Sequence, residues 1–123
     1  MTQRPKRVFL DNKLADWSAA YLAMWTALET FDPNADHWSD PIDFGGPEKR
    51  LAAAEQAIAR ASRHGTDSDA AQDIQAFRQQ VVRLTNDTSQ VPDAGLLQHL
   101  RDRGSLLADE SVTAANTAEQ TRL

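Results

Sequence analysis

A chain of 123 residues, 41% hydrophobic and 25% charged, has the length and composition of one folded domain with a single core. Its net charge of -5 disfavours nonspecific binding to DNA, RNA or anionic lipid, because their phosphates would repel the chain. The absence of cysteine excludes disulfides, thiolate zinc sites and cysteine nucleophiles, so the fold has to depend on packing.

The first eight residues form a basic arm on an otherwise acidic chain. Arg4, Lys6 and Arg7 make the arm a candidate nucleic-acid-binding site, with a solvated tail as the simpler interpretation. The apolar run that follows is too short for a signal peptide, and no apolar stretch reaches the length that spans a bilayer. We therefore expect a cytoplasmic protein that does not enter a membrane.

A helix is predicted over residues 9–31 by a stripe of large apolar side chains with alternating steps of four and three residues. A strand cannot produce this spacing, and the stripe covers an arc wide enough to face a core. Asp32 and Pro33 end the helix, because the residue before a proline is pushed towards an extended conformation. The stripe comprises Leu10, Leu14, Trp17, Tyr21, Met24, Leu28 and Phe31.

Residues 32–46 are predicted to be a long acidic loop, because they are dense in proline, glycine, asparagine and aspartate. Counted from Asp32, oxygen-bearing side chains occupy positions one, three, five, nine and twelve, as in a calcium-binding loop, which makes this segment a candidate metal site. Two departures favour a plain acidic loop instead: His37 stands where the turn needs glycine, and Asp43 where a longer glutamate binds with both oxygens. The candidate ligands are Asp32, Asn34, Asp36, Asp40 and Asp43.

Two further helices are predicted over residues 47–64 and 68–85. The first begins with Pro47 and has a thin apolar stripe dominated by alanine, so neighbouring helices can approach its backbone closely. Polar residues at 66–68 can cap the second, whose stripe contains larger apolar residues. Acidic side chains in the first turns and basic ones in the last complement both helix dipoles.

The carboxyl-terminal part is predicted to hold one or two short helices. Asp93 can cap a helix whose leucines face the core, and Gly104 is expected to end it. Residues 105–123 are then predicted to be a weakly ordered or conditionally helical tail. The fold class is therefore all-α, a bundle of three main helices plus these short ones, with residues 9–104 as the helical domain.

The helix over residues 9–31 also carries an unusual second face. Opposite the aromatic stripe lie alanines at steps of four residues, and Asp16 is the lone charge there. An exposed helix normally has more charge on this face, so the helix is expected either to lie at the centre of the bundle or to dock a second chain. The predicted partner-binding residues are Ala15, Ala19, Ala23 and Ala27.

No arrangement of residues in the chain defines an active site. His37, Ser39 and Asp40 are the residue types of a nucleophilic triad, but neighbours along an irregular segment rarely project into one line. The sequence therefore predicts a non-catalytic accessory or scaffolding protein that binds a protein partner or a second copy through a helix, without a cofactor. The alternatives are a nucleic-acid-associated regulator that uses the basic arm, and a metal-binding or catalytic protein that uses loop 32–43.

Overall fold

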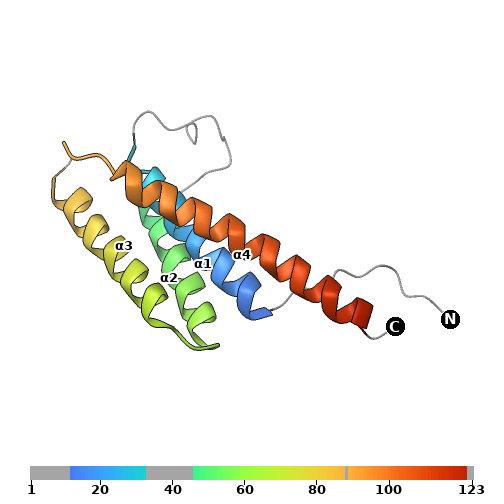
Figure 1. Cartoon of the computed structure of the whole chain (residues 1–123). Helices are drawn as coiled ribbons and strands as arrows, with labels where there is room; N and C mark the ends of the chain where they lie inside the picture. The colour runs from blue at the N-terminus through green and yellow to red at the C-terminus, as the bar shows by residue number, and fades with distance from the viewer. Residues whose placement is uncertain (1–11, 33–45, 88, 122–123) are drawn as a thin grey trace.

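The protein is a bundle of four helices in a computed structural model that describes residues 12–32, 46–87 and 89–121 (Figure 1). Helix α1 spans Asn12–Glu29, α2 Gly46–Ser62, α3 Ser68–Asn86 and α4 Ala94–Thr121. No strand occurs in these ranges, and the predicted all-α class is confirmed. Of the helices in these ranges, none has an apolar stretch sufficient to cross a bilayer.

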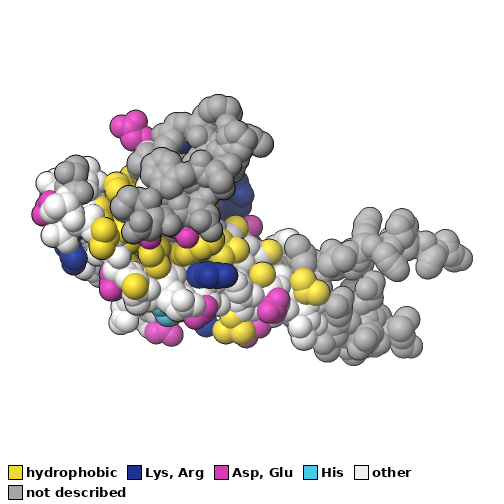
Figure 2. Space-filling view, turned by 90° about the horizontal axis from the view of Figure 1, so that it is seen from above, with side chains coloured by type: hydrophobic (Ala, Val, Ile, Leu, Met, Phe, Trp, Pro, Cys, Tyr) yellow, Lys and Arg dark blue, Asp and Glu magenta, His cyan; other side chains and the backbone are white. Residues whose placement is uncertain are grey.

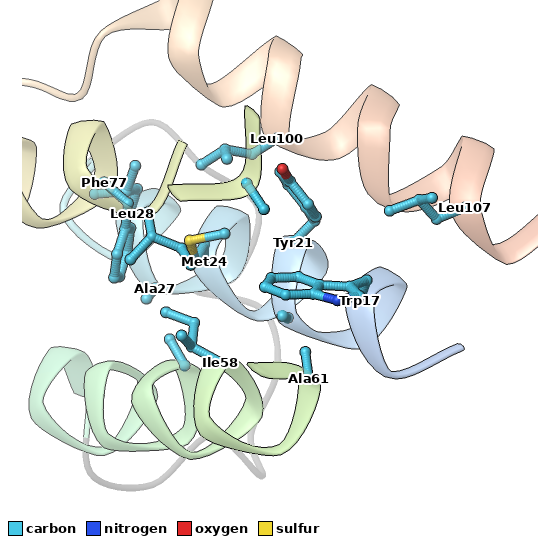
Figure 3. Close-up of a cluster of buried hydrophobic side chains, with 14 of the residues drawn as sticks. Trp17, Tyr21, Met24, Ala27, Leu28, Ile58, Ala61, Phe77, Leu100 and Leu107 are labelled. Carbon is cyan, nitrogen blue, oxygen red and sulfur yellow. The ribbon is translucent and has the colours of Figure 1, made fainter. Parts of the chain in front are cut away.

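Helix α1 is the central element of the bundle and packs mainly against α2 and α4 (Figures 1 and 3). The predicted aromatic stripe is confirmed, since its central members Trp17, Tyr21, Met24 and Leu28 are all buried. Leu14 and Phe31 pack against the core while half-buried. The predicted first turn of this helix, before Asn12, lies outside the described residues.

Side-chain size explains how closely the other helices approach α1. The α2 stripe contributes Ala54, Ala61 and only one larger buried side chain, Ile58, so the α2 backbone lies close to α1. Helix α3 contributes the bulkier Ile74, Phe77 and Leu84 to the same core. These side chains fill the space between α3 and α1, and the two backbones come close at few points.

Capping and turn residues set the ends of the helices. The Asp67 carboxylate accepts a hydrogen bond from the Ala70 backbone N–H at 2.8 Å, and Asp67 is the N-cap of α3, as the sequence predicts for this polar segment. Gly65 adopts a φ of 101° in the turn between α2 and α3, a conformation that favours glycine. At the start of α4, Asp93 accepts from the Leu96 N–H at 3.3 Å.

The prediction that Gly104 ends a short helix is wrong, because α4 is a helix of 28 residues that runs through Gly104 to Thr121. Gly104 lies where α4 crosses α1: a Cβ atom there would be 2.6 Å from Leu22 Cδ2 and 3.3 Å from the Leu22 backbone nitrogen. The Ser18 hydroxyl of α1 donates a buried hydrogen bond to the Gly104 carbonyl at 2.7 Å. Glycine is therefore needed for close helix contact rather than for termination.

Gly104→Ala should destabilise the bundle although alanine is the better helix former. Pushing Leu22 aside is expected to cost about 1–3 kcal/mol, which exceeds the propensity gain of at most about 1 kcal/mol. Denaturant unfolding of both proteins measures the difference.

Gly95→Ala is the matched control, because a Cβ atom at this α4 position meets only the Asp93 carboxylate oxygens, at 3.8 and 3.9 Å. We expect this variant to be neutral or slightly stabilised. Equal unfolding free energies for the two variants would contradict the close-contact role of Gly104.

Candidate protein-interaction face

The four alanines predicted to bind a partner do not share one environment. Ala19 is exposed, Ala15 and Ala23 are half-buried, and Ala27 is completely buried in the core. The physical reason is helical geometry, since residues four apart are displaced by about 40° around the axis. The row therefore turns by about 120° between Ala15 and Ala27, and its last member reaches the bundle interior. In this fold Ala27 is not available to a partner.

The remaining alanines lie on the side of α1 that its neighbours leave accessible. At about 100° per residue, Thr26 falls between Ala15 and Ala19 around the helix, and it too is half-buried. Its hydroxyl donates to the Leu22 carbonyl at 2.8 Å, so the side chain brings no unused donor to the surface. We refer to Ala15, Ala19, Ala23 and Thr26 as the open α1 face.

The charge that the sequence places near this face is paired within the chain. Asp16 Oδ2 lies 2.8 Å from Nε2 of His64, which follows the last turn of α2. This contact joins the end of α2 to α1 across 48 residues of chain. No charged side chain belongs to the open α1 face itself.

The two alternative sites fall almost wholly outside the described residues. Arg4, Lys6 and Arg7 lie there, and so do four of the five candidate metal ligands, Asn34, Asp36, Asp40 and Asp43. Only Asp32, half-buried just after α1, is described.

Neither alternative finds a counterpart in the described part of the chain. Within it, no group of three histidine or carboxylate side chains is arranged to hold a metal ion. On the face that Figure 2 shows, basic and acidic side chains are scattered among hydrophobic ones in the residues coloured there. Both alternatives therefore remain predictions from sequence.

A polar cluster that the sequence did not indicate joins three helices. The Tyr21 hydroxyl of α1 donates to Asp73 Oδ2 of α3 at 2.5 Å, and His99 Nε2 of α4 lies 3.0 Å from Asp73 Oδ1. Both carboxylate oxygens are thus used between helices, which indicates a structural role. The only signal in the sequence was that a buried tyrosine needs a partner for its hydroxyl.

Burial raises the pKa of the Tyr21 phenol above its ordinary range, and the hydrogen bond and negative charge of Asp73 raise it further. The nearby Arg103 guanidinium opposes this pKa shift. The folded state therefore keeps Tyr21 as the neutral phenol that donates to Asp73.

Comparison with known proteins gives no relative: no family model, no curated protein and no solved structure matches this chain. Any function therefore has to be argued from the described residues.

Alkaline pH should destabilise the protein through Tyr21. Because the folded-state pKa is raised, the stabilisation from the neutral phenol is complete below the unfolded-state value of about 10 and is lost as pH rises above it. Tyr21 is the only tyrosine, so phenolate absorbance reports this residue alone. We expect phenolate to appear only as helical circular dichroism is lost.

Tyr21→Phe is the control that isolates this effect from the titration of lysines. It should cost about 1–2 kcal/mol at neutral pH through the lost hydrogen bond, and should flatten the loss of stability above pH 10. Phenolate formation near pH 10 in a fully helical protein would contradict the assignment.

Proposed function

We propose that this chain is a non-catalytic interaction protein that binds through the open α1 face. The observation that carries the proposal is that, on the side of α1 that the other three described helices do not cover, the side chains are small and uncharged, and Ala19 among them is exposed. Small residues let a second helix backbone approach closely, which favours helix-to-helix contact over binding of a flat surface. Ala19, the exposed member, is at the centre of the proposed contact.

The partner that this face fits best is a second copy of the same chain. In a two-fold dimer the same patch meets itself, so any charge within it would lie near its own copy. The open α1 face has no charge, and the Asp16 carboxylate beside it lies 2.8 Å from His64 Nε2 of the same chain. Two copies of an acidic chain can therefore meet at this face without placing a charged side chain at the centre of the contact.

Ala19→Arg tests the proposal, because a long charged side chain would enter the centre of the contact. We expect the dissociation constant of the dimer to rise about tenfold or more, as measured by light scattering over a range of protein concentrations. Since Ala19 is exposed in the monomer, the free energy of unfolding of the monomer should change by no more than about 0.5 kcal/mol.

Ala59→Arg on α2 is the matched control, an exposed alanine in a helix and away from the open α1 face. It should leave both assembly and stability unchanged. Equal loss of assembly in the two variants would contradict the location of the contact, and a wild-type protein that stays monomeric at high concentration would contradict self-association.

A further inference from the structure

The two helices that flank the open α1 face carry exposed charges of opposite sign. Figure 3 shows α1 between α2 and α4, so each of these helices forms one edge of the face. Helix α2 carries the exposed Arg60, and α4 carries the exposed Asp102 and Asp109. In the described part of the chain none of these three side chains belongs to an ion pair. One edge therefore offers a cation and the other offers carboxylates.

Two contacts of α2 define where Arg60 lies. His64 contacts Asp16 of α1 and Glu55 contacts α3, from opposite sides of α2. At about 100° per residue, Arg60 is about 40° from His64 and about 140° from Glu55, away from the buried residues of α2. It is therefore on the edge beside the open α1 face. Because α2 runs antiparallel to α1, Arg60 is level with Ala20 (Figure 1).

The carboxylates lie at the outer edge of α4 because the arginines of this helix lie towards α1. The Arg101 Cζ atom is 5.6 Å from the centroid of a Trp25 ring, and Arg103 is near the buried tyrosine of α1. Asp102 and Asp109 instead lie about 140–160° around the axis from the glycine contact with α1. This edge of α4 is therefore acidic.

The acidic edge is also at the height of the basic one. Gly104 lies against Leu22 and bonds to Ser18, so it is level with the middle of these two residues, which is the height of the α2 arginine. At 1.5 Å per residue, Asp102 lies about 3 Å to one side of this height and Asp109 about 8 Å to the other. The arginine is thus level with the interval between the two carboxylates.

We propose that two copies of the chain meet with their α1 helices parallel, so that α2 of each copy lies over α4 of the other. This inference rests on the self-association proposed above and adds the arrangement of the dimer. A two-fold axis along α1 exchanges the two edges and leaves heights unchanged. Arg60 of each copy then pairs with the acidic edge of the other, and the two Asp16 carboxylates lie on opposite sides of the contact.

The other simple arrangement has its two-fold axis across α1, and like charges disfavour it. That axis brings α2 against α2. Arg60 is only one residue in height from Ala19, the centre of the proposed contact, so the two Arg60 side chains would face each other. Like charges placed together at an interface reduce affinity, whereas opposite charges fix the register of two partners.

Charge exchange between the two edges tests the arrangement. Arg60→Glu, and separately Asp102→Lys with Asp109→Lys, place like charges at both edges of the proposed dimer. At low ionic strength each should raise the dissociation constant about tenfold or more, measured by light scattering. A chain with all three substitutions restores opposite charges and should return to within about threefold of the wild-type value. Circular dichroism should show unchanged helicity, because all three positions are exposed.

Arg83→Glu is the matched control, since it makes the same change of charge at an exposed residue of α3, which forms neither edge. It should leave the dissociation constant within about twofold of the wild-type value. A dimer that Arg60→Glu leaves unchanged or tightens, or that the three substitutions together do not restore, would overturn the parallel arrangement alone. A wild-type chain that stays monomeric would overturn self-association and this arrangement together.

Discussion

The close approach of α2 and α4 to α1 is the constraint on which the rest of this bundle depends. It requires small residues at the contacts: alanines along α2, and Gly104 where α4 meets Leu22. Interiors are packed nearly as tightly as organic crystals, so even one added methyl group has to displace a neighbour. Helices α2 and α4 thus cover two sides of α1 at short range, and α3 covers a third side through larger side chains. The exposed Ala19 lies on the side that these three described helices leave uncovered.

The placement of α3 depends on polar bonds as well as on apolar packing. Asp73 connects it to Tyr21 and His99, the buried Gln80 accepts from the Asp93 backbone N–H at 2.7 Å, and Arg78 reaches Glu55 on α2. The Glu55 pKa is lowered by the hydrogen bond from Arg78, which keeps the carboxylate charged. Side-chain bridges of this kind can span a gap between helix backbones, and the Arg78–Glu55 pair does so between α2 and α3, whose backbones hardly approach each other.

The open α1 face follows from the unequal spacing of the helices. Where α2 and α4 lie close to α1, they leave between them a strip of small neutral residues that another helix backbone could approach. Where α2 and α3 stay apart, the larger side chains of α3 and the Arg78–Glu55 ion pair bridge the space between the two backbones.

The sequence by itself determined the helical class, the core stripes and several helix ends. These features depend on residues within about four positions of each other, as in the Trp17 to Leu28 stripe and the Asp67 cap. Only the tertiary structure decided that Gly104 is a contact rather than a helix end, that Ala27 lies inside the core, and that Asp16 pairs with His64. Each of these depends on contacts between residues distant in the chain or on how far a row of side chains turns around its helix. Local residue spacing does not encode which neighbouring helix a given side chain will meet.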